Sequence, residues 1–480
     1  MSIDQQINES FRPVSEGLAS VIFYAEPFTG YDIKLILVWL VIGALFFTLY
    51  LGFINFRYFG HAIRIVSGKY YSKKEGVDGQ ISPFQALMTS LSGTVGLGNI
   101  AGVAVAISVG GPGAAFWMFV MGLFGMSTKF AEAAMGVKYR HHATSGDTKK
   151  ISGGPMYYLR DAFDNRDIPY LGHIMASLFS FCCAVAALGA ASMFQSNQSF
   201  QQFVNITGGA EGFLADKGWM YGLFLAFLTG LVILGGIRSI AAVASKIVPL
   251  MGGLYLLSGL VVIGMDYERV PGAFIRIFEL ALTPEAGLGG VIGALLVGVQ
   301  RAVFSNEAGL GSAAIPHSAA QTDSHIRQGF VAMLGPFIDT AVICMVTAFV
   351  IVLTGAYQEA DGMEGMVLTS RAFETAIPFF PYLLAFIVFL FAFSTIISWS
   401  YYGLKSATYL FGESNAVEYG YKIIFLAFVV VGASSALENV ILFTDSAVFI
   451  MAIPNLIGLY LLAPELKRDL KAYIQDLKNE

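Results

Sequence analysis

Long apolar segments recur along this chain, and they constrain its fold more than any other feature of the sequence. A helix needs about 20 apolar residues to cross a bilayer, and every backbone polar group inside lipid must find a partner within the protein. Charged residues make up only 13% of the chain, against about 25% in soluble domains. We therefore expect an all-α polytopic membrane protein. The eleven expected membrane-spanning helices lie near residues 35–55, 82–106, 112–137, 168–204, 219–236, 243–265, 289–315, 328–356, 380–404, 421–436 and 440–463.

Basic residues are distributed unevenly between the loops on the two sides of these segments. With the N-terminus outside, 20 Lys and Arg residues fall on the cytoplasmic side and six on the outer side. Because cytoplasmic loops carry an excess of Lys and Arg, we expect a multi-pass protein of the cell (inner) membrane with its C-terminus in the cytoplasm. Residues 1–19 are polar and lack the apolar core of a cleavable signal peptide, so the first membrane-spanning helix is expected to act as an uncleaved signal.

The same tripeptide, Gly-Leu-Gly, interrupts two of the apolar segments. Residues 93–99 read GTVGLGN, and residues 305–312 read SNEAGLGS. Glycine costs a helix about 1 kcal/mol relative to alanine, so two glycines within three residues predict a break in each helix. The breaks lie in the second and seventh segments, with four full segments between them. The two broken segments therefore cross the membrane in opposite directions, and each begins a five-helix unit that follows one additional N-terminal helix. This is the pattern of a 5+5 inverted repeat.

A helix break at membrane depth exposes backbone groups that need buried partners. The N–H groups at the start of a half-helix suit a carboxylate, and freed carbonyl oxygens suit a hard monovalent cation. A zwitterionic amino acid together with sodium would satisfy both sets of groups. The paired breaks therefore predict a binding site of the kind that secondary transporters place near the bilayer midplane.

Other functions fit the Gly-Leu-Gly pattern less well. The stretches GLGNIA and GLGSAA match a dinucleotide-binding pattern, but no charged residue follows the first until Lys129, and no strand precedes it. Close helix packing through small residues explains one such stretch better than two at equivalent repeat positions. An ion channel could use freed carbonyls. A membrane enzyme would need a nucleophile with its base, or metal ligands, at membrane depth, and the sequence offers neither.

Several polar residues lie at membrane depth and allow more than one role. Gln85 precedes Asn99 by about four turns, so it either reaches the binding site or forms hydrogen bonds between helices. Glu307 lies in the second break, where it could cap backbone N–H groups, carry charge for coupling, or pair with Arg301. Pairing is the expected role because buried charges are normally paired, and Asp339 is a further candidate partner.

The ninth segment carries hydroxyl groups in an otherwise apolar helix. Ser394 and Ser398 share one face at i,i+4 spacing, as do Thr395 and Trp399. These faces could offer oxygen to a cation and border a small ligand, or the hydroxyls could bond back to their own helix. The polar stretch MFQSNQSFQQF at 193–203 is expected near the outer surface, as a possible vestibule lining.

Several motifs together resemble the alanine or glycine:cation symporter (AGCS) family. They are SGTVGLGNIAGVA (92–104), GGPGAAFWMF…GMSTKFAEA (110–133), GGPMYYL (153–159), QRAVFSNEAGLGSAA (300–314) and FSTIISWSYYG (393–403). The resemblance runs from about residue 35 to 465. It implies a leucine-transporter-type fold and sodium-coupled symport of alanine or glycine into the cell. The alternative on the same fold is an amino-acid exchanger or a proton-coupled carrier.

The resemblance also implies site residues. The implied contacts for the small amino acid are Gln85, Asn99, Phe304, Thr395 and Trp399, with the backbone near Gly96, Gly98 and Gly309. The implied sodium site comprises the carbonyls of Ser92 and Val95 with the hydroxyls of Ser394 and Ser398. Thr94, with Asn99, matches a second cation position of some relatives.

The chain departs from the family pattern at two places. Phe119 stands where a second tryptophan is usual, which we expect to affect packing only. Leu404 stands where an acidic residue is usual, which bears on the inner gate. No cofactor is expected besides the coupling ion, and Cys182, Cys183 and Cys344 lie in apolar runs where a disulfide framework is not expected.

The expected organisation follows from these features. The expected parts are an extracellular segment (1–34), the additional helix with a cytoplasmic loop (35–81), the two repeats (82–266 and 289–463) and a cytoplasmic tail (464–480). The tail is charged on all sides, so we expect a solvated helix without a special role.

Overall fold

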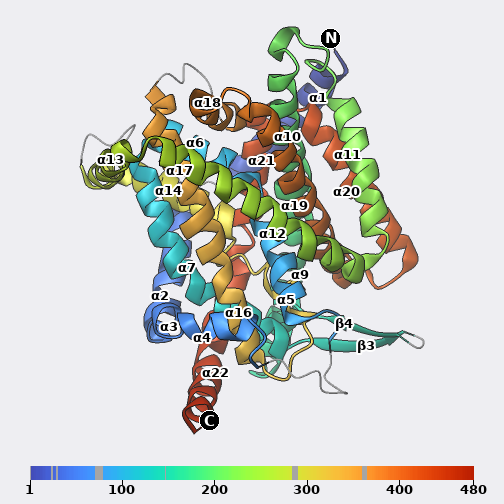
Figure 1. Ribbon diagram of the computed structural model, residues 1–480. Helices are drawn as coiled ribbons and strands as arrows, with labels where there is room; N and C mark the ends of the chain where they lie inside the picture. The colour runs from blue at the N-terminus through green and yellow to red at the C-terminus, as the bar shows by residue number, and fades with distance from the viewer. Residues whose placement is uncertain are drawn as a thin grey trace.

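The computed structural model describes residues 2–22, 25–28, 31–70, 79–145, 148–283, 290–358 and 365–479. It is a bundle of helices with the N-terminus at one end and the C-terminus at the other (Figure 1). The helices up to residue 206 are α1 (Ile3–Ile22), α2 (Leu35–Tyr50), α3 (Ile54–Arg57), α4 (Phe59–Val66), α5 (Pro83–Thr94), η1 (Leu97–Asn99), α6 (Ala101–Gly110), α7 (Gly113–Lys138), α8 (Pro155–Asp164), α9 (Pro169–Ala186), η2 (Ala187–Met193) and α10 (Phe194–Ile206).

The second part of the chain continues the bundle. Its helices are η3 (Gly209–Glu211), α11 (Gly218–Ile233), α12 (Gly236–Met265), η4 (Tyr267–Arg269), α13 (Val270–Leu282), α14 (Gly290–Asn306), α15 (Ala314–Ser318), α16 (His325–Pro336), η5 (Phe337–Cys344), α17 (Met345–Thr354), η6 (Ala356–Gln358), α18 (Met366–Ala376), α19 (Phe380–Phe411), α20 (Asn415–Ser434), α21 (Leu437–Phe449) and α22 (Ala452–Asn479). Of all these elements, η2 in the first part and η5 in the second are π-helical turns inside longer helices.

The described helices include many that can cross a membrane. Seven are long and apolar enough, or eight if the pair formed by α5 and the segment Leu97–Gly110, bent by 58°, is one span. The apolar helices α2, α11 and α14 are shorter. The chain is therefore an α-helical polytopic membrane protein, while the count of eleven spans stays a prediction.

Two short antiparallel hairpins depart from the expectation of a purely helical chain. Strands β1 (Ala25–Phe28) and β2 (Tyr31–Lys34) pair with Ala25 opposite Lys34. Strands β3 (His141–Ser145) and β4 (Thr148–Ser152) pair with His141 opposite Ser152. Both hairpins lie in connections between helices, so the architecture remains helical.

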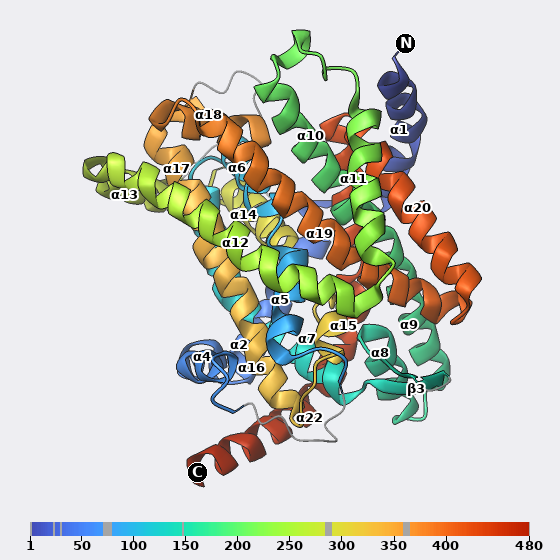
Figure 2. The same ribbon diagram turned by 45° about the vertical axis from the view of Figure 1, so that its right-hand side comes forward.

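Each predicted repeat has a short extra helix between its second and third long helices. In the first repeat α8 follows α7, and in the second α18 follows α17. These two short helices lie at opposite ends of the molecule (Figure 2). That arrangement is what an inverted repeat would produce. The predicted start of the second repeat, residue 289, lies outside the described residues.

The segments that flank the two broken helices are joined to each other. Ile81, just before α5, forms a parallel β-bridge with Ala320, just after α15. The N–H of Gln80 donates to the carbonyl of Ala319 at 2.8 Å, and the N–H of Gln321 donates to the carbonyl of Ile81 at 2.7 Å. The broken helices are therefore connected at one end by backbone hydrogen bonds.

The C-terminal tail is docked rather than solvated on all sides. Lys138 at the end of α7 forms ion pairs with both Glu465 and Asp469 of α22. On the same helix, Leu466 and Leu470 are buried. The expectation of a fully solvated tail was wrong because its apolar residues recur every four positions and pack against the body of the protein.

Candidate functional site at the helix breaks

The first break releases backbone carbonyl groups of α5. The N–H of Gly96 bonds to the carbonyl of Thr94 and to Asn99 Oδ1, both at 3.0 Å, and the N–H of Asn99 bonds to the carbonyl of Gly96 at 3.1 Å. In a continuous helix these two N–H groups would bond to the carbonyls of Ser92 and Val95. The break therefore withdraws the helical partners of both carbonyls, which are the two that the sequence predicts as sodium ligands.

The second break is held by a buried carboxylate. Glu132 of α7 accepts hydrogen bonds from the N–H groups of Gly309 (2.8 Å) and Gly311 (2.9 Å). Asn455 donates to the carbonyl of Gly309 at 2.7 Å, and Lys129 donates to that of Asn306 at 2.9 Å. Gly309 was predicted to hold the charged ends of a ligand, but the structure commits its N–H and carbonyl groups to protein side chains.

Asn99 connects the two breaks. Its Nδ2 donates to Ser305 Oγ of α14 at 2.8 Å and to the backbone carbonyl of Asp339 in η5 at 3.0 Å. The carboxylate of Asp339 accepts a hydrogen bond from the hydroxyl of Thr340 rather than from Arg301. Asn99 thus uses its whole amide to hold the first break against α14 and η5.

A small cavity lies at the first break. Its lining includes six residues from the predicted site and four that were not predicted. The predicted six are Thr94, Gly96, Gly98, Phe304, Thr395 and Trp399, and the other four are Gly93, Ala190, Gln195 and Glu307. Asn99 and Gly309 lie in the breaks but do not line this cavity.

Side chains from three helices approach the first break closely. A Cβ atom at Gly96 would lie 2.6 Å from Thr395 Oγ1 of α19 and 3.0 Å from Gln195 Oε1 of α10. One at Gly98 would lie 3.2 Å from the ring of Phe304. Glycine is therefore required at Gly96 because any side chain would collide with the cavity wall.

Gln195 belongs to the site although it was not predicted there. Its Oε1 accepts a hydrogen bond from the N–H of Leu97 at 2.9 Å, and its Nε2 donates to the carbonyl of Ala190 at 3.1 Å. The polar stretch 193–203 was expected near the outer surface as a vestibule lining, and its residues 193–200 are all buried within the protein. The signal in the sequence is the polar stripe Gln195, Gln198, Ser199 and Gln202, which follows one face of a helix.

Glu307 forms hydrogen bonds with Trp399 and Ser312 and does not pair with Arg301. Trp399 Nε1 donates to Glu307 Oε1 at 2.9 Å, and the hydroxyl of Ser312 donates to the other carboxylate oxygen. Arg301 instead forms a buried ion pair with Asp445 of α21. The expected pairing of Arg301 with Glu307 was wrong because an acid 144 residues away in the sequence takes the guanidinium.

The predicted sodium ligands meet where α5 contacts α19. Ser92 Oγ donates to the carbonyl of Ser394 at 2.6 Å, and Ser394 Oγ donates back to the carbonyl of Phe391 at 3.0 Å. Ser398 Oγ, one turn further along α19, is buried and has no hydrogen-bond partner among the described residues, and the same holds for Thr395 Oγ1. Two buried hydroxyls without a partner are costly unless a ligand or water completes them.

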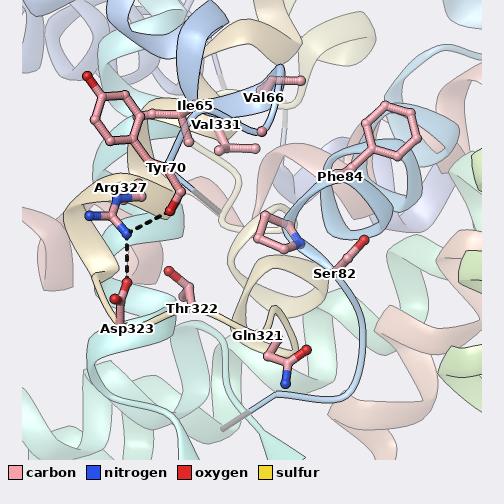
Figure 3. Close-up of a pocket in the computed structure, with 12 residues that line it drawn as sticks. Ile65, Val66, Tyr70, Ser82, Phe84, Gln321, Thr322, Asp323, Arg327 and Val331 are labelled. Atoms are coloured by element: carbon pink, nitrogen blue, oxygen red, sulfur yellow. Dashed lines mark hydrogen bonds and ion pairs between the residues drawn. The ribbon is translucent and has the colours of Figure 1, made fainter. Parts of the chain in front are cut away.

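Gln85 lies away from the cavity. It forms a capping box with Ser82 at the start of α5, in which Ser82 N donates to Gln85 Oε1 at 3.0 Å and Gln85 N donates to Ser82 Oγ at 3.1 Å. Ser82, Pro83 and Phe84 line a separate pocket with Tyr70 and Arg327 (Figure 3). In that pocket Arg327 donates to Asp323 and to the carbonyl of Tyr70. The structure therefore does not bring Gln85 to the residues around the first break.

Comparisons with known proteins agree with this arrangement. Residues 17–480 match the model of the sodium:alanine symporter family. The sodium/alanine symporter AgcS of Methanococcus maripaludis is 41% identical over 447 residues, which cover 92% of this chain and 95% of AgcS. The amino-acid carrier protein AlsT of Bacillus subtilis is 37% identical over 359 residues, covering 74% and 72%. The crystal structure of MhsT in complex with L-phenylalanine has a TM-score of 0.57 at 14% identity, covering 83% and 99%, which shows a shared fold.

Proposed function

Because this chain belongs to the sodium:alanine symporter family, it is a sodium-coupled amino-acid transporter with a leucine-transporter-type fold, and we propose that its cargo is alanine or glycine. It is a multi-pass membrane protein and not an enzyme. Alanine is the amino acid in the names of the family and of AgcS. We place this cargo at the small cavity in the first break.

The observation that carries the proposal is the first helix break. Three glycines, Gly93, Gly96 and Gly98, line the cavity, so the backbone itself approaches the ligand. Phe304 and Trp399 contribute large rings to the wall, which favours a ligand with a small side chain. In the proposed complex the ligand carboxylate meets the backbone at Gly98 and the unpartnered hydroxyl of Thr395.

The coupling sodium is proposed to bind beside the same break. Its ligands would be the carbonyls of Ser92 and Val95, whose helical partners are diverted, and the hydroxyls of Ser394 and Ser398. Carbonyl and hydroxyl oxygens are the ligand types that hard cations prefer. Thr94, which lines the cavity, is the candidate for a second cation.

The proposed orientation places the N-terminus outside and the C-terminus in the cytoplasm, as the distribution of basic residues favours. Within the repeats 82–266 and 289–463, one bundle of helices would then rock against a scaffold around the cavity, exposing it to one side at a time. Sodium bound at the first break would favour the state that accepts the amino acid, and linkage makes this coupling reciprocal.

The test is alanine uptake into proteoliposomes under an inward sodium gradient, with choline replacing sodium in a parallel reaction. Uptake that collapses in choline supports sodium symport of alanine. Uptake that persists in choline and follows internal amino acid or a pH gradient would contradict it and indicate an exchanger or a proton-coupled carrier. Competition with glycine and with larger amino acids measures the size limit of the cavity.

A further inference from the structure

One acid lies in the wall of the cavity and forms no ion pair with any basic residue that the structure describes. Among the described residues that line the cavity, Glu307 is the only one with a charged side chain. It is 5% exposed. Arg301 pairs with Asp445, and the ammonium of Lys129, which donates to the carbonyl of Asn306, acts on Glu307 through its charge but forms no ion pair with it. A charge buried in this way is costly until an opposite charge reaches it.

The backbone and two donors hold Glu307 in place. Its φ of 57° lies in the left-handed region, which is uncommon for residues other than glycine and is typically retained at functional sites. Trp399 Nε1 donates to one carboxylate oxygen and the hydroxyl of Ser312 to the other. Because an ionised carboxylate accepts about four hydrogen bonds, each oxygen retains a site for a further donor.

The cavity therefore presents two chemically different regions to a ligand. The first break offers backbone groups at Gly98 and the free hydroxyl of Thr395, whereas Glu307 offers negative charge. A zwitterionic amino acid has a matching pair of groups, because its ammonium carries three donors and a positive charge. A 2-hydroxy acid of the same size has the carboxylate but no charge for Glu307.

We propose that Glu307 binds the α-ammonium group of the transported amino acid and so selects amino acids over hydroxy acids of the same shape. This inference rests on the proposed function, since it assumes that the cavity holds an amino acid. Trp399 then has two roles: its ring closes the cavity, and its indole N–H orients the carboxylate. The charge of Glu307, rather than its size, is the property that matters.

The test compares Glu307→Gln with Glu438→Gln, the same change at an exposed position. Glu307→Gln keeps the shape and an acceptor but removes the charge, so the apparent affinity for alanine should fall about 10- to 100-fold. Glu438→Gln should transport alanine like the unsubstituted protein. Glu307→Asp should recover part of the affinity. An unchanged alanine affinity in Glu307→Gln would overturn the proposal.

Two further readouts separate this role from a structural one. Sodium alone should raise the thermal unfolding midpoint of Glu307→Gln as it does that of the unsubstituted protein, which shows that the variant is folded and binds its ion. The preference for alanine over L-lactate in competition should fall with the alanine affinity, and an unchanged preference would contradict the proposal. If the unsubstituted protein neither transports nor is stabilised by alanine, the proposed function itself has failed instead.

Discussion

Single residues decide how close a ligand can come to the backbone of this transporter. Gly96 is packed against Thr395 and Gln195, so the atoms that surround the cavity leave no space for even a methyl group there. Gly102, a few residues later in α6, has no atom from a neighbouring element within 4 Å of the position that its Cβ would take. A side chain is therefore excluded by steric collision at Gly96 but not at Gly102.

We expect Gly96→Ala to reduce sodium-dependent alanine uptake by at least about tenfold, because the methyl group displaces the hydroxyl and amide that line the cavity. Gly102→Ala should transport normally and be more stable by up to about 1 kcal/mol, since alanine favours the helix. Initial uptake rates in proteoliposomes measure the first effect and chemical unfolding the second. Equal uptake by both variants would argue that the cavity is not the transport site.

The sequence located part of the site and missed the rest for identifiable reasons. Gly96 and Thr395 could be placed because local spacing and family motifs mark them. Gln195 and Glu307 were not assigned to the cavity wall because their contacts join residues far apart in the chain, such as Leu97 with Gln195 and Trp399 with Glu307. Local patterns carry little information about which distant side chain completes a site.

At the scale of helices, α7 holds the second break. Glu132 receives two backbone N–H groups from the break, and Asn455 of α22 donates to the same carboxylate oxygen at 3.1 Å. The positions of both breaks were predictable because glycine is costly in a helix. The partners of the backbone groups at each break were not predictable, since both breaks carry the same tripeptide. The first break lies beside a cavity, whereas the second is held by a buried acid.

We expect Glu132→Ala to destabilise the protein by about 2 kcal/mol or more, because two buried N–H groups would lose their acceptor. The unfolding midpoint in detergent should fall both with and without alanine, since Glu132 does not line the cavity. Glu438→Ala, at an exposed position, is the matched control. A variant with normal stability and weaker alanine binding would instead place Glu132 in the binding site.

At the scale of the whole molecule, charges attach the C-terminal helix to the body. Burial alone would raise the pKa of Asp469, but the hydrogen bond from Lys138 and the charges of Lys138 and His325 hold this pKa below its usual value. The pKa of Glu465 is lowered in the same way, against the effect of burial, by Lys138 and Tyr139. A carboxyl whose pKa is lower in the docked state stabilises docking above its free pKa of roughly 4, and this contribution is lost as the pH falls through the docked pKa.

We expect Lys138→Gln to loosen α22 at neutral pH, because both carboxylates lose their cation. Hydrogen–deuterium exchange over residues 465–473, corrected for intrinsic rates, should rise in this variant and stay unchanged in Lys471→Gln, where an exposed lysine is replaced. The unsubstituted protein should keep its protection from pH 8 to about 5 and lose it below roughly pH 4. Full protection of the tail in Lys138→Gln would contradict this account.

The backbone bridge between Ile81 and Ala320 has a mechanical consequence. It fastens the entry of one broken helix to the exit of the other, and Asn99 ties the same two helices together near their breaks. Because the two broken helices are joined at two places along their length, they should tilt together as a rigid body and not separate. The part of the cavity wall around Gly96 and Phe304 would then move as a rigid unit relative to the neighbouring helices. The bound amino acid would keep its contacts with these residues while access closes on one side of the membrane and opens on the other.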